Sequence, residues 1–240
     1  MKKMLLVLFV FSSLAAVSQE VTLKLNYKKG DKYLLKVAMD QSLGIMGGMN
    51  MEADMHMSII NVTSDNITTE ARIKRMAVDV LQGATRMSFD SDNVDENSSE
   101  QQIMKQQFDP MLKAVITQVT DRYGKLISAK VEPQVPGMDN FGQQSEYPKT
   151  PVKVGSTWET ETKDATSGNI KMSYKVTKIT GTTLFADITG SASALPGSEI
   201  KGTLEVDIAT GNPNKVDVLI ATEVQGSKIT IKTTVTSTKI

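Results

Sequence analysis

The feature of this sequence that most constrains its fold is the alternation of apolar and polar residues along most of its length. Between residues 21 and 28, every second residue is apolar and the residues between them are polar. Successive side chains of a β-strand point to opposite faces, so this pattern predicts strands with one buried and one solvated face. Further strands, separated by Gly, Asn, Asp or Pro turns, are predicted at 33–41, 49–62, 67–81, 86–89, 113–120, 125–131, 157–162, 169–180, 182–192, 202–208, 215–223 and 227–238.

One stretch has helical spacing instead. Ser98 or Ser99 can cap a first turn, and Pro110 is expected to end or kink the helix. The apolar residues that fall on one side at this spacing are Ile103, Met104, Phe108, Met111 and Leu112. The sequence therefore predicts a mainly β protein with one short helix.

The two series of predicted strands resemble each other. The matching segments, in chain order, are 30–33 with 155–158, 57–63 with 172–177, and Asp121 and Gly124 with Asp207 and Gly211. The preserved order indicates an ancient duplication. We expect residues 19–240 to form a single all-β domain from two similar halves, about 21–131 and 152–238, joined by a loop at 132–151. The expected fold is a large antiparallel sheet wrapped into a half-barrel or a sandwich.

The first eighteen residues have the three-part layout of a secretory signal peptide. Two lysines precede an apolar run at 4–11, and the small residues Ala16 and Ser18 stand where a signal peptidase would cut before Gln19. The apolar run is shorter than the ~20 residues that a membrane-spanning helix needs. We therefore expect a signal peptide at 1–18 and an exported protein, periplasmic or secreted, without a transmembrane anchor.

Charge and missing side chains exclude several functions. Lys and Arg number 27, and so do Asp and Glu, so the balance argues against nucleic acid as a partner. The absence of cysteine excludes disulfides and thiolate chemistry, and the single histidine leaves a catalytic triad or a zinc site without partners. No phosphate-binding glycine loop occurs. We therefore expect no enzymatic activity and no cofactor.

The most distinctive segment is a methionine row at 49–57. In a strand, Met49, Met51, Met55 and Met57 share one face, which makes them the candidate ligand-binding residues. Such a row is typical of filled core, because methionine adapts to irregular packing. It is also suited to the wall of a cavity that accepts apolar ligands of varied shape. A third interpretation is Cu(I) binding, mainly through Met46 and Met49, because thioether sulfur is a soft ligand.

Two polar groups are candidate cation sites with simpler explanations. His56 shares the opposite face of its strand with Glu52 and Asp54, which is typical of a solvated face and leaves a divalent cation as the alternative. The acidic residues after the predicted strand at 86–89 are Asp90, Asp92, Asp95 and Glu96. Their spacing lacks the glycine and the distal glutamate of an EF-hand, so we interpret them as a mobile acidic loop. No metal site is predicted.

Three blocks of the sequence resemble the signature blocks of an uncharacterised family of exported proteins and lipoproteins common in the Bacteroidota. These blocks lie at 27–33, 148–158 and 202–211, and the resemblance covers nearly all of the chain after the signal peptide. Members of that family are often anchored through a lipidated cysteine, which this sequence lacks. The resemblance implies no established activity and no catalytic residue. A wrapped antiparallel sheet with a helix against it is also similar in fold to periplasmic lipoprotein carriers, although fold alone does not fix function.

Three functional hypotheses follow. The first is a non-catalytic exported protein that binds a lipid-like apolar ligand in a cavity of the sheet beside the methionine row. The second is a structural or protein-interaction module of the cell envelope that uses free strand edges and loops. The third is Cu(I) binding by the methionine-rich segment.

Overall fold

The computed structural model describes residues 19–135, 138, 146–164, 168–195, 197–224 and 226–240. The predicted signal peptide and residues 136–137 and 139–145 of the predicted loop at 132–151 lie outside the described residues. The elements of the first half are β1 (Lys32–Ser42), the 3-10 turn η1 (Gly44–Met46), β2 (Gly47–Val62), β3 (Asn66–Gln82), β4 (Thr85–Asp90), α1 (Ser99–Lys113), β5 (Val115–Asp121) and β6 (Leu126–Glu132). Those of the second half are β7 (Thr157–Asp164), β8 (Gly168–Ile179), β9 (Thr183–Ala192), β10 (Glu199–Asp207), β11 (Pro213–Val224) and β12 (Ser227–Lys239).

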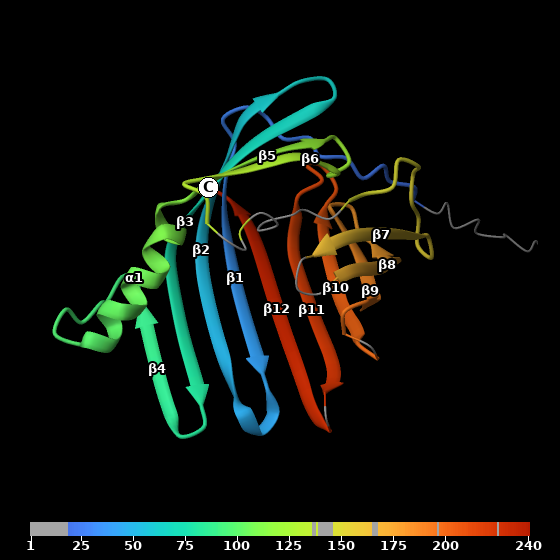
Figure 1. Ribbon diagram of the computed structural model, residues 1–240. Helices are drawn as coiled ribbons and strands as arrows, with labels where there is room; N and C mark the ends of the chain where they lie inside the picture. Colours follow the sequence, from blue (N-terminus) through green and yellow to red (C-terminus); the bar gives the residue numbers. More distant parts are fainter. Residues whose placement is uncertain (1–18, 136–137, 139–145, 165–167, 196, 225) are drawn as a thin grey trace, which may run out of the picture.

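The strands form one antiparallel sheet of twelve, which confirms the predicted wrapped β architecture (Figure 1). Their order is β6-β5-β3-β2-β1-β12-β11-β10-β9-β8-β7, with β4 paired to the C-terminal part of β3. The first and last strands therefore pair in the middle of the sheet, where Val37 lies opposite Val235. Strands of the predicted first half lie on one side of this pairing and those of the second half on the other. The result is one open sheet rather than a two-sheet sandwich.

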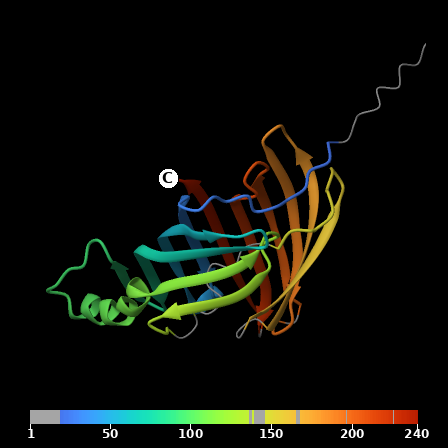
Figure 2. The same cartoon turned by 90° about the horizontal axis from the view of Figure 1, so that it is seen from above.

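The sheet bends strongly out of plane towards its two ends. Figures 1 and 2 show β5–β6 and β7–β8 turning across the direction of the middle strands. Glycines permit close strand approach at the second bend. A Cβ atom at Gly190 would lie 2.2 Å from the carbonyl oxygen of Lys171, and one at Gly202 would lie 2.1 Å from that of Asp217. Only glycine fits at such positions.

Residues 21–27 are extended but do not join the sheet, so the prediction of a strand there is wrong. Only Val21 forms a bridge, with Val152. The backbone N–H of Leu25 donates to the carbonyl of Arg122 at 2.8 Å, and that of Asn26 donates to the carbonyl of Thr210 at 2.7 Å. The alternation is real, because every second side chain is buried. This segment satisfies its backbone groups with turns of the sheet rather than with a neighbouring strand.

The buried residues form two clusters on the same face of the sheet, which we call the inner face. Core 1 lies beneath the N-terminal segment and takes most of its residues from β7 to β10 together with β1, β2 and β3. Its members include Leu23, Leu25, Tyr33, Trp158 and Tyr174, and the rings of the last two stack with centroids 4.8 Å apart.

Core 2 lies between α1 and strands β2 to β6. Met104 is the buried residue of α1, and Phe108 packs on Phe89 of β4 with ring centroids 5.4 Å apart. The Ser98 side chain caps the helix by accepting from the Gln101 backbone N–H at 3.3 Å, as predicted. The helix continues to Lys113, three residues beyond Pro110, rather than ending at the proline.

Candidate functional site

The structure divides the predicted methionine row into two pairs. Exposure alternates along β2: the four methionines are buried or partly buried, and residues between them, such as Asn50, are more exposed. All four methionine side chains therefore lie on the inner face. Met55 is 2% exposed in core 2, and Met57 is 5% exposed in core 1. Met49 and Met51 are only partly buried and pack on the edge of core 2. The row is therefore filled core at one end and accessible surface at the other.

The register of the β1–β2 hairpin adds a methionine that the row alone does not indicate. Met39 of β1 lies directly opposite Met51, and Gln41 lies opposite Met49. Directly opposed residues in an antiparallel pair have Cβ atoms about 5 Å apart, so Met39 and Met51 form a cross-strand pair. The alternation in β1 predicts which face Met39 lies on. Only the register of the hairpin shows that Met39 lies opposite Met51.

Beyond β1, the partly exposed surface continues across β12 and β11. Ile231 lies opposite Gln41 on one side and opposite Ile220 on the other. Val235 lies opposite Val37, and Ile229 lies at the start of β12. We call this surface the apolar strip. It consists of Met39, Met49, Met51, Ile220, Ile229, Ile231 and Val235, all partly exposed.

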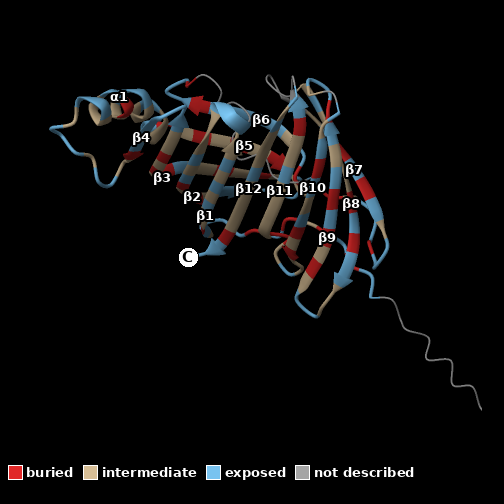
Figure 3. Ribbon diagram, turned by 90° about the horizontal axis from the view of Figure 1, so that it is seen from below, coloured by how far each residue is buried: buried red, intermediate tan, exposed pale blue. Residues whose placement is uncertain are grey.

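The apolar strip lies between the two cores. Val216 of β11, Val235 of β12 and Val37 of β1 lie in one row across the sheet. Val216 packs against core 1 and Val37 packs against core 2, with Val235 between them. Within the described part of the chain, Val235, Met39 and the three isoleucines are not among the side chains that pack on either core. Figure 3 shows β12 and β11 largely in the intermediate colour, with buried segments in the strands on both sides.

The apolar strip is uncharged. Its polar neighbours on the inner face are Gln41, Thr222 and Thr233, none of which ionises. Lys239 shares this face at the far end of β12, beyond Ser237, where it forms an ion pair with Asp31. Charged residues beside the strip, such as Asp40, Glu52 and Lys232, point to the outer face. This arrangement presents a surface of hydrocarbon and thioether groups.

Three surface grooves lie mainly along outer-face side chains, and two of them reach the apolar strip. The largest includes Met49, and another includes Met39 and Met51. The largest, about 440 Å³, is lined mainly by side chains around Asp40, Asn50, Asp79 and Arg86. A second, of about 300 Å³, includes Glu52 and Lys232, and a third, of about 310 Å³, lies over β7, β8 and β9. Each lining mixes charged or polar side chains with methionine, so none of these three grooves is uniformly apolar.

His56 is exposed on the outer face, as interpreted from the sequence. Its neighbour Glu52 accepts a hydrogen bond from Arg75 at 3.3 Å, which occupies one of the carboxylates of the candidate cation site. Among the residues that the structure describes, no three His, Asp or Glu side chains are grouped closely enough to hold a metal ion.

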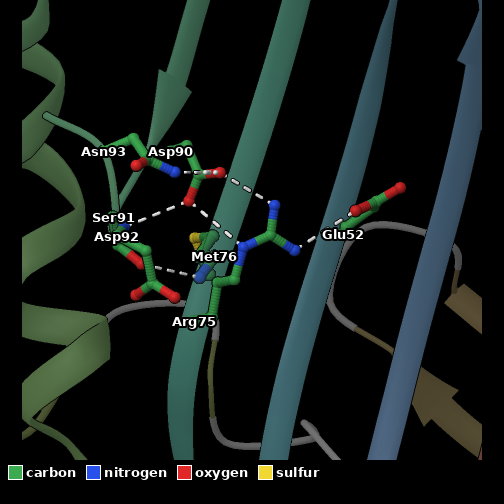
Figure 4. Close-up of polar contacts among 7 residues, drawn as sticks. All are labelled: Glu52, Arg75, Met76, Asp90, Ser91, Asp92 and Asn93. Carbon is green, nitrogen blue, oxygen red and sulfur yellow. Dashed lines mark hydrogen bonds and ion pairs between the residues drawn. The ribbon is translucent and has the colours of Figure 1, made fainter.

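The acidic stretch begins at the last residue of β4, Asp90, whose carboxylate has a structural partner (Figure 4). Arg75 donates to both oxygens of Asp90, from Nε at 3.2 Å and from Nη2 at 2.8 Å. The Arg75 hydrogen bond is the main reason that the pKa of Asp90 is lowered. Asp90 also accepts from the backbone N–H of Asp92 at 3.1 Å, and the Ser91 hydroxyl accepts from that of Met76 at 3.0 Å. These contacts fasten β4 and the following turn to β3.

The sequence matches no protein-family model and no curated protein. In the described ranges, none of the helical segments combines the length and the apolar character required to cross a lipid bilayer.

Proposed function

We propose that this is a non-catalytic exported protein that binds a lipid-like apolar ligand along the apolar strip. The observation that carries the proposal is the gap between the two cores, where seven apolar side chains on four adjacent strands stay partly exposed. Apolar surface left in contact with water costs about 25 cal/mol per Å² relative to burial. A ligand that covers the apolar strip would recover that free energy.

The size and composition of the apolar strip favour a flexible hydrocarbon ligand. At the usual strand spacing, four strands cover roughly 14 Å, and residues 229–235 extend over roughly 20 Å. That area accommodates an extended acyl chain. Three of the seven side chains are methionines, which adjust their rotamers to ligands of different shape.

In this proposal the apolar strip binds the ligand and does not react with it. Its side chains supply neither a nucleophile nor a group that exchanges a proton near neutral pH. A ligand in contact with Met39, Met51 and Ile231 would be retained by burial alone. Its release would then depend on a competing apolar surface.

Probe binding tests the proposal. We expect the fluorescent apolar probe N-phenyl-1-naphthylamine to bind the protein, and Met39→Gln/Met51→Gln to weaken that binding about tenfold, because both contacts become polar. Leu219→Ser is the matched control, since Leu219 is a 40% exposed apolar residue of β11. Its neighbours Val218 and Ile220 belong to the inner face, so Leu219 points outward.

Native mass spectrometry of protein purified from its own host provides an independent measurement. We expect a population with a lipid-sized adduct that Met39→Gln/Met51→Gln loses. Only unliganded protein, together with no uptake of the probe, would contradict the proposal. Equal loss of probe binding in Leu219→Ser would show that the effect does not come from the inner face.

A further inference from the structure

The β1–β2 hairpin ends in a group of strongly exposed apolar side chains. Ile45 is 95% exposed and Met46 is 56% exposed, both in the 3-10 turn η1. Leu81 of β3, 49% exposed, lies beside them because it is paired with Gly48. We call Ile45, Met46 and Leu81 the apolar tip.

The apolar tip is built into the sheet. The backbone N–H of Leu43 donates to the carbonyl of Gly47 at 2.8 Å and closes the turn. Gly47 has φ of +124°, and a Cβ atom there would lie 1.9 Å from the carbonyl oxygen of Leu81. Only glycine allows this approach, so the turn is held against β3. The consequence is that Ile45 and Met46 are held facing solvent.

The apolar tip lies at the end of the sheet where the apolar strip begins. Met49 follows Gly47 by two residues, and the pairing of Ser42 with Thr230 brings the turn beside Ile229 and Ile231. In Figure 1 the β1–β2 and β11–β12 hairpins both lie at the lower end of the sheet, opposite β5–β6. A ligand that leaves the apolar strip at this end passes the apolar tip.

We propose that the apolar tip inserts into the surface of a phospholipid bilayer, where the protein exchanges its ligand. The exchange depends on the ligand-binding function proposed above, whereas the insertion does not. Each partner in a stable protein complex buries roughly 800 Å², far more than three side chains expose. A bilayer requires no complementary shape and accepts a few apolar side chains at its acyl boundary. The protruding position of Ile45 therefore fits a bilayer better than a protein partner.

Flotation with phosphatidylcholine vesicles tests this proposal. We expect the chain that begins at Gln19 to float with the vesicles, and Ile45→Ser/Met46→Ser to reduce the bound fraction about tenfold, because two apolar side chains are lost. The matched control is Ile127→Ser. Ile127 is 56% exposed, like Met46, but lies on β6 at the other end of the sheet. The control should float like the wild type, and all variants should keep the wild-type circular dichroism.

A gain-of-binding variant makes the test independent of any loss of folding. Ile45→Trp should bind vesicles more tightly, with a blue shift of its fluorescence on binding, because tryptophan favours the membrane interface. The native Trp158 is 8% exposed and gives a constant background.

Three results would overturn the proposal. These are no flotation of the wild type, equal loss in Ile127→Ser, and no shift in Ile45→Trp. Uptake of N-phenyl-1-naphthylamine separates the two proposals. If Ile45→Ser/Met46→Ser retains the probe but loses the vesicles, both proposals are supported. If the wild type floats without taking up the probe, the ligand proposal fails and the bilayer proposal stands.

Discussion

Arg75 owes its position to one extra residue in β3. Inner-face apolar residues fall at odd positions up to Ile73 and at even positions from Met76 onward. The register shifts at this point, with Asp54 opposite Arg75 and Met55 opposite Ile73, so Lys74 has no partner in β2. A bulge of this kind redirects side chains. Here it lets Arg75 reach both Asp90 and Glu52.

Asp90→Asn is expected to lower the free energy of unfolding by about 1–2 kcal/mol at pH 7, because the ion pair with Arg75 is lost in a partly exposed setting. The native pKa of Asp90 is lowered, so the native state binds this proton less readily than the unfolded state. The stabilisation is complete above the unfolded pKa of about 4 and disappears as the pH falls through the native value.

Urea unfolding at pH 7 and at pH 2 measures this effect. The stability difference between the wild type and Asp90→Asn should shrink in acid. Asp92→Asn is the control, since Asp92 is exposed and it is its backbone N–H that binds Asp90. A difference that is independent of pH would contradict the assigned role of Arg75. The pKa values of Asp31 and Asp217 are also lowered, mainly by hydrogen bonds from Lys239 and Lys215, so the wild type should itself lose stability in acid.

The individual strands were predictable from the sequence, but the order in which they pair was not. The alternation that defines β1, β2 and β9 is a local property, because the side chains of every strand alternate between faces. The pairing of β1 with β12 joins residues about 200 positions apart, which no local pattern encodes. Residues 21–27 alternate like a strand because one side of them is buried, although they lie outside the sheet.

The candidate site was predicted in part for the same reason. The shared face of the methionine row follows from alternation, and the structure confirms that these residues share a face. Whether each methionine is covered depends on elements elsewhere in the chain. Core 2, which contains Met55, also contains Met104 of α1, and core 1, which contains Met57, also contains the N-terminal segment. Among the residues that the structure describes, Met39, Ile231 and Val235 belong to neither core, and only the fold shows that.

Gly202→Ala tests the role of glycine in the bend of the sheet. The added methyl would lie 2.1 Å from the Asp217 carbonyl oxygen, so we expect a loss of about 1–3 kcal/mol in the free energy of unfolding. Gly181→Ala is the matched control, because a Cβ atom there meets nothing within 4 Å. Urea midpoints compare the two. Equal midpoints would mean that the strands around Gly202 relax without cost.

At the scale of the whole molecule, the N-terminal segment fastens the sheet across its bend. It hydrogen-bonds to the turn after β5 and to the turn after β10, which belong to different halves. Tyr27 adds a hydrogen bond from its hydroxyl to the side-chain oxygen of Asn212 at 2.9 Å. Its own Leu23 and Leu25 are completely buried in core 1. Cleavage before Gln19 would leave all of these contacts in place.

Leu25→Ala is expected to cost about 2–5 kcal/mol, because it opens a cavity in core 1 beneath this segment. Lys24→Ala is the control, since Lys24 lies next to Leu25 and its side chain is on the opposite side of the extended segment. Thermal and urea unfolding report the difference. Similar stability of the two variants would show that the segment contributes little to the joined sheet.

The central position of the β1–β12 pair has a consequence for biosynthesis. The thirteen residues of β12 follow the other described strands in the chain, and until they are synthesised β1 lacks the neighbour that joins the two halves. The two halves therefore cannot be joined before β12 has been synthesised, and contacts of such long sequence separation form slowly. If the protein is exported as proposed, this late joining leaves the chain unfolded for longer before it crosses the membrane.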